Sequence, residues 1–261
     1  MIIDGLLAFV IAPGPSGAAA QIATPGSATL QPDADPVLAY ALHCTQSTNS
    51  FAQVITPSGH DTTRGWRVHG GNSTQRSALV GVHPLTPKLE RGETLNITIG
   101  GSATAGDVEF LVLGIAYPKI PGEFAGADVL RRVRHVTSIS GTITPSTNGQ
   151  WPTGTALASL QDTLRANQRY AVLGVSVSDA NGIACAMLVG PDTSNYRVPL
   201  PVWDSQFFPQ ATPHRMAALA EQSGLPLVPV INSGNKTSTF LGLVANENGT
   251  PRNFSLLLGL L

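Results

Sequence analysis

The side chains that could carry out acid–base or metal chemistry are few, and their spacing suits neither. No two of the six histidines have the i, i+4 spacing of a helical zinc site; they are His43, His60, His69, His83, His135 and His214. His60-Asp61 could be half of a catalytic pair, in which the imidazole is the base and the carboxylate orients it. Gly59 before this pair and Thr62-Thr63 after it are typical of a turn. The pattern favours a turn over a catalytic pair.

Two aspartates near the start of the chain are candidate calcium ligands. Asp33 and Asp35, together with Gln31, offer hard oxygen atoms. Pro32 and Pro36 bracket them, which favours a solvated loop between strands. The chain also lacks the G-x-S-x-G nucleophile elbow, the H-E-x-x-H zinc motif and the phosphate-binding P-loop. We therefore expect no catalytic residue, no metal site and no cofactor.

One dense basic cluster stands out, Arg131-Arg132-Val133-Arg134-His135. Its three arginines, Arg131, Arg132 and Arg134, are candidates for contact with an anionic layer, because guanidinium groups bind phosphate and lipid headgroups. The alternative is that the cluster forms one exposed strand face with no ligand. The sequence alone leaves both interpretations open.

Four aromatic residues lie in proline-rich segments and are candidate interface residues: Trp151, Trp203, Phe207 and Phe208. Aromatic side chains in irregular segments commonly anchor protein–protein interfaces. They can equally close the end of a β sandwich. Both roles remain open from the sequence.

The elements that must position these side chains are constrained by charge. Only 12% of the residues are charged, 15 basic and 16 acidic, where about 25% is usual. A monomer of this mass would expose roughly 10,900 Å², or about one charge per 350 Å². The net charge of -1 excludes the basic surplus of a nucleic-acid binder, and the 42% apolar content excludes a disordered tail. The composition predicts a folded protein that buries much of its outside against other molecules.

Short apolar runs separated by turn residues predict strands. The 27 glycines and 20 prolines break the chain into such runs. The runs are rich in Val, Ile and Leu and span residues 79–82, 110–115, 170–177, 184–189, 225–231, 240–244 and 254–261. Residues 94–99 (TLNITI) alternate instead, with the period of two of a half-buried strand. The pattern predicts an all-β fold, a sandwich or a barrel.

One α-helix is predicted in the second half of the chain. Thr212 is a suitable N-cap, Pro213 a suitable first helical residue, and Gly224 a suitable stop. The helix would span residues 213–222 and bury three residues, Met216, Leu219 and Ala220. A further helical turn is predicted at residues 73–78.

The cysteines and the N-terminal segment do not indicate in which cellular compartment the protein resides. Cys44 and Cys185 lie far apart, and we expect two buried thiols rather than a disulfide framework. Residues 6–12 are apolar and 18–20 are small, as in a secretion signal, but Asp4 stands where such signals carry positive charge. We expect the segment to be part of the folded protein.

Four segments of the first half match four segments of the second half in the same order. The offset between partners increases once, between the second and third pairs, and the predicted helix lies where that insertion falls. The seam would be a Pro/Gly-rich linker at about residues 117–126, which gives domains of residues 1–120 and 121–261, each large enough for an eight-stranded sandwich. The matched pairs are 29–40 with 163–174, 61–68 with 192–198, 79–82 with 227–230, and 110–115 with 255–260.

Three blocks of the second half, together with the duplication, resemble a known family. They are residues 170–175 (YAVLGV), 188–192 (LVGPD), and 225–236 (LPLVPVINSGNK) with the final run 254–261. The chain resembles the double-jelly-roll major capsid proteins of tailless icosahedral bacteriophages, the corticovirus-like members of the adenovirus-hexon lineage. The resemblance implies two tandem jelly rolls, each an eight-stranded antiparallel sandwich, with one short helix inserted in the second. It implies no catalytic residue.

The resemblance also implies partners and a location. The chain would pair with itself as a homotrimer, forming pseudo-hexameric capsomers that contact one another in an icosahedral shell. Other expected partners are penton or minor capsid proteins and an internal membrane or genome layer, without sequence-specific binding of nucleic acid. The protein would be made in the host cytoplasm and reside in the virion as a structural protein, not an enzyme.

Two alternatives share this composition. A cement or decoration protein on another shell would not need two similar halves, and the opening Met1-Ile2-Ile3-Asp4 is similar to that of small phage cement proteins. A carbohydrate-binding or adhesive β sandwich would need exposed aromatic residues on one face, for which Trp151 and Trp203 are the candidates.

Overall fold

Strands form most of the described molecule. The computed structural model describes residues 2–4, 6–8, 11–13, 22–30, 32–33, 35–45, 51–59, 65–69, 76–81, 89–100, 110–117, 122–145, 152–160, 164–178, 183–204, 215–245 and 250–261. These residues contain one α-helix and otherwise strands and short 3-10 helices. The predicted all-β class is confirmed.

The first half of the chain builds two sheets, which together we call the first sandwich. The first large sheet has the order β2-β10-β5-β8, with β3 also paired to β10: β2 (Leu6–Ala8), β3 (Ile11–Pro13), β10 (Phe110–Tyr117), β5 (Val37–Thr45) and β8 (Arg76–Gly81). The first small sheet has the order β4-β9-β6-β7: β4 (Ile22–Thr29), β9 (Thr94–Gly100), β6 (Phe51–Ile55) and β7 (Trp66–His69).

The second half of the chain, joined by the N-terminal strand β1, builds two further sheets, which we call the second sandwich. In the second large sheet the order is β1-β11-β18-β14-β20-β12, and β17 pairs with β14 in parallel: β1 (Ile2–Asp4), β11 (Glu123–Ala125), β18 (Val228–Asn232), β14 (Arg169–Val177), β20 (Arg252–Leu260), β12 (His135–Ile143) and β17 (Val202–Asp204). In the second small sheet the order is β13-β19-β15-β16: β13 (Thr155–Ala156), β19 (Phe240–Ala245), β15 (Ile183–Val189) and β16 (Val198–Leu200).

The two sandwiches share one strand order among the described strands. If β2 and β3 count as one interrupted strand, the large sheet of the first sandwich joins its first, eighth, third and sixth strands, and the small sheet its second, seventh, fourth and fifth. The second sandwich, counted from β12 to β20 without β17, has the same order in both of its sheets. Two unrelated sandwiches would not be expected to place all eight strands in the same order by chance.

The internal sequence matches fall on strands with the same place in this order. The first matched pair ends within the third strands, β5 and β14, and the fifth, sixth and eighth strands contain or border the other three pairs. The helix α1 (Arg215–Ser223) lies between β17 and β18, where the sequence offset increases. The sequence matches and the strand order therefore agree on which strands of the two halves correspond.

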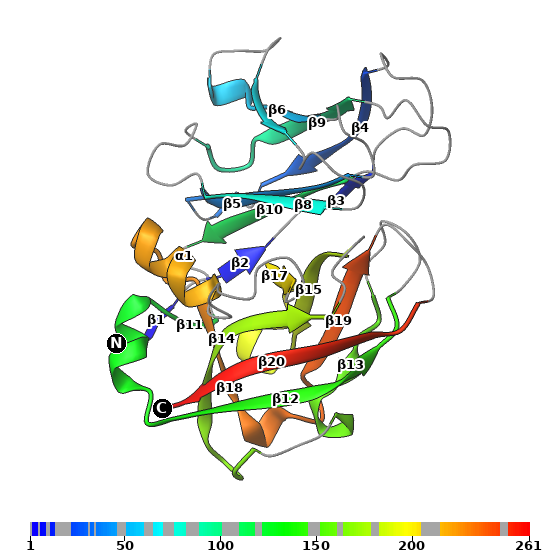
Figure 1. Cartoon of the computed structure of the whole chain (residues 1–261). Coiled ribbons are helices and arrows are strands. Elements are labelled where there is room, and N and C mark those ends of the chain that lie inside the picture. Colours follow the sequence, from blue (N-terminus) through cyan, green and yellow to red (C-terminus); the bar gives the residue numbers. More distant parts are fainter. Residues whose placement is uncertain are drawn as a thin grey trace.

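The four sheets lie in four successive layers. In Figure 1 the first small sheet is uppermost, followed by the first large sheet, the second small sheet and the second large sheet. The two middle layers touch each other, since β5 and β8 contact β15, and β2 contacts β16. The helix α1 fills the seam between the sandwiches, because it packs against β14 and β18 of one and β8 of the other.

Burial explains why some strands are apolar throughout and others alternate. In the middle layers both strand faces are covered: every described side chain from Leu38 to Ala41 on β5 and from Leu111 to Leu113 on β10 is at most 1% exposed. Strands covered on both faces read as continuous apolar runs. In the outer layers β9 and β12 bury alternate residues, such as Leu95 and Ile97 on either side of exposed Asn96. Period two is the mark of a sheet with one uncovered face.

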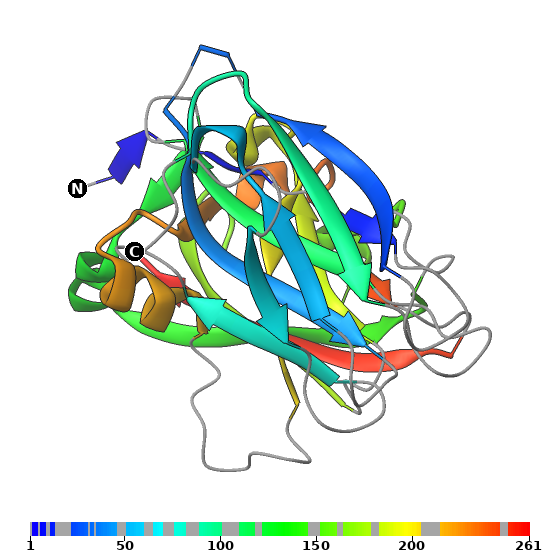
Figure 2. The same cartoon turned by 90° about the horizontal axis from the view of Figure 1, so that it is seen from above.

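The helix α1 largely follows its prediction. Met216, Leu219 and Ala220 are buried, and Gly224 ends the helix with a φ of 70°, donating its N–H to the Ala220 carbonyl at 2.9 Å. A left-handed φ favours glycine at this position. The expected N-cap and first helical residue, Thr212 and Pro213, lie outside the described residues. Figures 1 and 2 place α1 beside η2 (Ala127–Arg132), with which it is in contact.

Four other 3-10 helices lie between strands: η1 (Pro57–Gly59), η3 (Leu157–Ser159), η4 (Pro191–Thr193) and η5 (Ser233–Asn235). Only one regular element was predicted wrongly among the described residues. The expected helical turn at residues 73–78 is wrong, because β8 begins at Arg76 and pairs with β5 through Ala78 opposite His43. Cross-strand pairing there outweighs the local preference. The signal-like segment 6–12 contributes to β2 and β3.

The layer order predicts unequal losses of stability when threonine is introduced at two adjacent residues of β9. Ile97→Thr should lower the free energy of unfolding by about 1.5–3 kcal/mol, because it places a hydroxyl in the apolar core. Asn96→Thr should change it by less than about 0.5 kcal/mol, because this side chain is exposed on the outer face. Urea unfolding at one protein concentration measures both. Equal losses would contradict the assigned register.

Candidate functional site: the faces through which the sandwiches pack

The contact between the two sandwiches is an apolar interface of two sheet faces. It joins the first large sheet to the second small sheet. On the second side Ile183, Cys185, Ala186, Met187 and Leu188 are all buried to within 1% exposure. These strands have no charged residue between Ile183 and Val189 or between Phe110 and Tyr117. The described strands at this contact therefore hold the sandwiches together by apolar burial, in the manner of a protein core.

The Tyr40 side chain carries a hydrogen bond across this interface. It lies on β5 and is fully buried. Its ring lies over Gly114 of the paired strand β10, where an added Cβ would come within 2.4 Å of the Tyr40 Cζ atom. The Tyr40 hydroxyl donates to the Pro199 carbonyl of β16 at 2.5 Å. The glycine thus makes room for a ring whose hydroxyl joins the first sandwich to the second.

The environment of Tyr40 keeps its hydroxyl in the donor form. Burial raises the pKa of Tyr40 well above 10.0, and the nearby thiol of Cys185 on β15 raises this pKa further. A phenolate here would be a charge without solvent, facing a carbonyl oxygen. Cys185 is buried and forms no disulfide, as expected, whereas the side chain of Cys44 lies outside the described residues.

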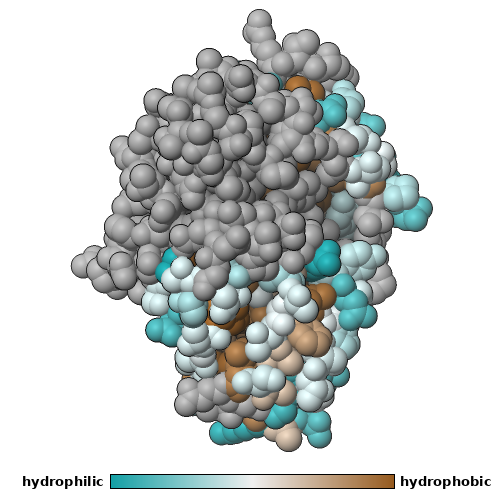
Figure 3. All heavy atoms as spheres, turned by 90° about the vertical axis from the view of Figure 1, so that its right-hand side faces the viewer, coloured by the Kyte–Doolittle hydropathy of each residue, from teal (hydrophilic) through white to brown (hydrophobic). Residues whose placement is uncertain are grey.

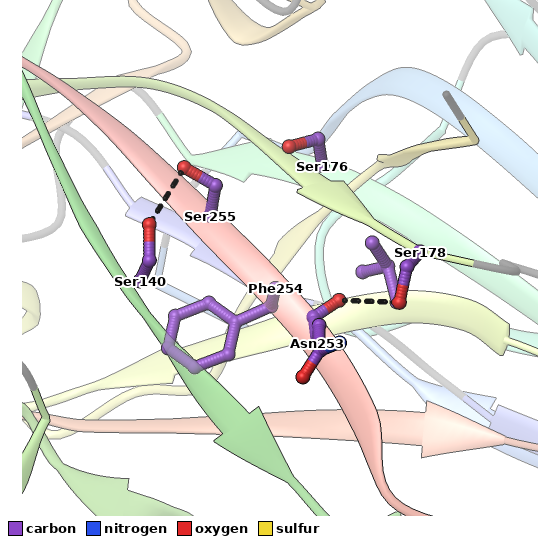
Figure 4. A pocket seen from close by; sticks show the side chains of 7 residues that line it. Ser140, Ser176, Ser178, Asn253, Phe254 and Ser255 are labelled. Atoms are coloured by element: carbon purple, nitrogen blue, oxygen red, sulfur yellow. Dashed lines mark hydrogen bonds between the residues drawn. The ribbon is translucent and has the colours of Figure 1, made fainter. Parts of the chain in front are cut away.

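The outer face of the second large sheet is lined with small, uncharged polar side chains. Ser140 on β12, Ser255 on β20 and Ser176 on β14 stand side by side across three strands. Ser140 Oγ donates to Ser255 Oγ at 3.3 Å, and Ser178 Oγ donates to the Asn253 carbonyl at 3.3 Å (Figure 4). Together they line a shallow hollow of about 320 Å³. Such a face offers hydroxyl groups for hydrogen bonds, and its small side chains let another molecule come close to the backbone. No charged group would have to lose its hydration on binding.

The outer face of the first small sheet is the other uncovered sheet face. On it Arg67 of β7 donates from Nε to the Gln53 Oε1 atom at 2.8 Å, and its guanidinium lies 4.3 Å from the centre of the Phe51 ring. Exposed Asn96 of β9 lies on the same side. This stacking holds the single arginine flat against the sheet. Arg67 is the one formally charged residue in the sequences of β4, β6, β7 and β9.

The three predicted arginines lie together at one end of the second sandwich. Arg131 and Arg132 end η2, Arg134 directly precedes β12, and all three are exposed. Arg132 forms an exposed ion pair with Asp128 at 3.7 Å. Arg134 is held in place through its backbone, since its N–H donates to the Leu260 carbonyl of β20 at 2.8 Å. Their role as contacts for an anionic layer stays a prediction.

The four aromatic candidates are mostly not placed. Trp151, Phe207 and Phe208 lie outside the described residues. Trp203 is on β17, opposite Ser176 of β14, but its side chain is not described. Their role as interface residues also stays a prediction.

Within the described ranges, no group of three or more His, Cys, Asp or Glu side chains could hold a metal ion. Of the candidate calcium ligands, Asp35 accepts two hydrogen bonds from Arg91, at 2.5 and 2.7 Å, and Gln31 is not described. Asp35 is therefore engaged in an exposed ion pair. No helix in the described part of the chain is long and apolar enough to cross a membrane.

The sequence did not single out Tyr40, which joins the two sandwiches, or the serines on the outer face of the second large sheet. Tyr40 was visible only as a polar ring inside an apolar run, aligned with Gly174 in the repeat. The serines of the second large sheet have no motif, because their common feature is a shared face of three strands. A signal did exist in β12, where Ser138, Ser140 and Thr142 alternate with Ile139 and Ile143.

Comparison with known proteins gives no sequence relative. No family model matches the chain, and no curated protein does. Among solved structures the chain is similar to the STIV MCP, with 7% identity, a TM-score of 0.24, and coverage of 98% of this chain and 97% of that one. It is also similar to the major capsid protein P2 from bacteriophage PM2, with 9% identity, a TM-score of 0.21, and coverage of 97% and 98%. Both neighbours are viral major capsid proteins, but likenesses at this level carry no argument, so function must be argued from strand order and packing.

The close approach of Gly114 to Tyr40 predicts a costly substitution. Gly114→Ala should lower the free energy of unfolding by about 1–3 kcal/mol, because the new methyl group would displace the Tyr40 ring. Gly126→Ala is the matched control: its Cβ would meet only the Asp128 Oδ1 atom, at 3.3 Å, and should change stability by less than about 0.5 kcal/mol. Thermal or urea unfolding measures both. A neutral Gly114→Ala would contradict the described position of the Tyr40 ring.

The raised pKa of Tyr40 predicts a loss of stability in alkali. In the unfolded chain Tyr40 loses its proton near pH 10.0, whereas the folded protein keeps it. The stabilisation is complete below that pH and declines as the pH rises toward the folded pKa, because the unfolded state binds fewer protons. From about pH 9 to about pH 11, wild type should therefore lose more unfolding free energy than Tyr40→Phe. Parallel pH curves for the two proteins would count against a buried hydroxyl at residue 40.

Proposed function

We propose that this protein is the major capsid protein of a virus, assembling as trimeric, pseudo-hexameric capsomers of an icosahedral shell. Each chain would supply two similar sandwiches, so that three chains place six similar units around a ring. The proposal rests chiefly on one observation, the way the two sandwiches of one chain pack on each other.

That packing is a contact between unlike faces. The first large sheet lies against the second small sheet, which leaves exposed, among the described residues, the outer face of the first small sheet and the part of the second large sheet around Ser138, Ser140 and Thr142. These two faces are a large-sheet face and a small-sheet face of equivalent strand order. A second copy could therefore repeat between chains the contact made within a chain. Unlike-face contacts of this kind close into a ring when the rotation between units allows it.

The tandem jelly-roll assignment is part of the proposal. The strand order, in which the first and eighth strands are neighbours and each sandwich splits into two four-stranded sets, supports a jelly roll in each half. We divide the chain into residues 1–120 and 121–261. One strand crosses this division, since β1 pairs with β11 and extends the second large sheet.

The scarcity of charge supports the same proposal. On the outer face of the second large sheet, described residues such as Ser138, Ser140, Thr142 and Ser255 carry no charge. Figure 3, a view of one side of the molecule, shows the described surface of the second sandwich with many pale residues of near-neutral hydropathy, brown apolar patches between them, and teal hydrophilic residues mainly toward the rim. Such a surface loses little solvation energy when it is covered. In the proposed shell it would be covered by neighbouring copies.

Further parts of the assembly follow from the capsid role. We propose that Trp151, Trp203, Phe207 and Phe208 contribute to contacts between copies, and that penton or minor capsid proteins complete the shell. The protein would be made in the host cytoplasm and act in the virion.

The oligomeric state of the purified protein tests the proposal. Wild type should sediment as a trimer at micromolar concentration. Ser255→Arg should shift it to folded monomers, because the substitution places a charge in the middle of the outer face of the second large sheet. Thr237→Arg, at an exposed site beyond η5, is the control and should remain trimeric. A monomeric wild type would overturn the proposal, as would trimers that tolerate Ser255→Arg.

A further inference from the structure

Three large apolar side chains are exposed in the described part of the chain: Leu130 (40%), Val136 (47%) and Tyr196 (37%). Isolated exposed apolar residues are common on soluble proteins and need no explanation. These three share a setting, however, because each neighbours a basic residue in the chain. Leu130 precedes Arg131, Val136 follows His135, and Tyr196 precedes Arg197.

All three lie at the same end of the second sandwich. A series of backbone hydrogen bonds crosses this end from strand to strand: Arg134 N–H to the Leu260 carbonyl at 2.8 Å, Leu261 N–H to the Arg169 carbonyl at 3.0 Å, and Ser233 N–H to the Gln168 carbonyl at 2.9 Å. This end of the second sandwich thus contains the start of β12, the end of β20, the start of β14 and the end of β18. In Figure 1 the C-terminus and the start of β12 lie together there, beside η2.

The turn that contains Tyr196 is fixed to the same end. Asp192 of η4 accepts a hydrogen bond from the Asn232 N–H at 3.0 Å and another from the Asn235 side chain at 2.9 Å. Thr193 bonds within the turn, donating from Oγ1 to the Tyr196 carbonyl at 2.8 Å. Tyr196 is therefore presented by a rigid turn rather than by a free loop.

The charge of this end is strongly basic against a chain of net charge -1. Six exposed arginines lie on it: Arg131, Arg132, Arg134, Arg165, Arg169 and Arg197. The acidic side chains described there are Glu123, Asp128 and Asp192, of which Glu123 pairs with Arg169 at 2.6 Å and Asp128 pairs with Arg132 at 3.7 Å. Since exposed ion pairs are weak and easily exchanged, these arginines can still meet an external anion.

We infer that this end of the second sandwich docks on an anionic lipid bilayer, with the arginines at the headgroups and Leu130, Val136 and Tyr196 at the boundary with the acyl chains. Arginines alone would serve a nucleic acid equally well. Exposed apolar and tyrosine side chains among them favour a bilayer, because such side chains gain by entering the interfacial region. The inference deepens the proposed capsid function and rests on it for its biological meaning, since it names the layer beneath the shell.

Vesicle co-sedimentation of the full chain tests the inference. Wild type should sediment with vesicles that contain about one-third phosphatidylserine and not with pure phosphatidylcholine vesicles, and high salt should release it. Arg131→Gln/Arg134→Gln should weaken binding by about tenfold or more, at roughly one headgroup interaction lost per arginine. Leu130→Ser/Val136→Thr should also weaken it, whereas Arg91→Gln, an exposed arginine of the first sandwich, should not.

Two results would overturn the inference. One is a folded wild type that does not sediment with the anionic vesicles. The other is a protein that binds a single-stranded oligonucleotide, loses that binding in the arginine variant but not in Leu130→Ser/Val136→Thr, and does not bind vesicles, which would assign the end to a nucleic acid. Sedimentation mass on the same samples separates the two proposals. A trimer that does not bind vesicles refutes only the proposed contact with lipid. A monomer that binds vesicles refutes only the proposed trimeric capsomer.

Discussion

The packing of the first large sheet against the second small sheet is the constraint on which the rest of the structure depends. The central parts of the strands at this contact are apolar on both faces, and the Tyr40 hydroxyl crosses it by donating a hydrogen bond to the Pro199 carbonyl. That bond in turn requires Gly114 beneath the ring. Because the contact joins unlike faces, it orders the four layers and decides which two faces are left at the ends of the stack.

Much of this architecture was predictable from the sequence, because layer position determines hydrophobic pattern. The uninterrupted run of β10 and the alternation of β9 distinguish a strand covered on both faces from one covered on a single face. The repeat placed the helix α1 between the right strands, and its stop at Gly224 follows from a left-handed φ. The turn expected at residues 73–78 failed because its local composition carries no information about β5, the strand with which β8 pairs.

The candidate site was less predictable, because it consists of faces rather than of motifs. Ser140, Ser176 and Ser255 come from three strands that are distant in sequence and become neighbours only through strand pairing. Tyr40 and Cys185 likewise meet only when the sandwiches pack. The basic cluster was visible because its arginines are contiguous. Its apolar companions, Leu130 and Val136, were not recognised because exposure cannot be read from residue type.

Low charge acquires a physical meaning in this arrangement. If sandwiches pack face to face within a chain and again between chains, most sheet surface meets another sheet, and charges there would cost desolvation energy. Negative-stain electron microscopy of the purified protein tests this central claim most directly. The account predicts rings of six similar lobes with threefold symmetry, one pair of lobes per chain. Isolated two-lobed particles, or rings with a different number of lobes, would contradict it.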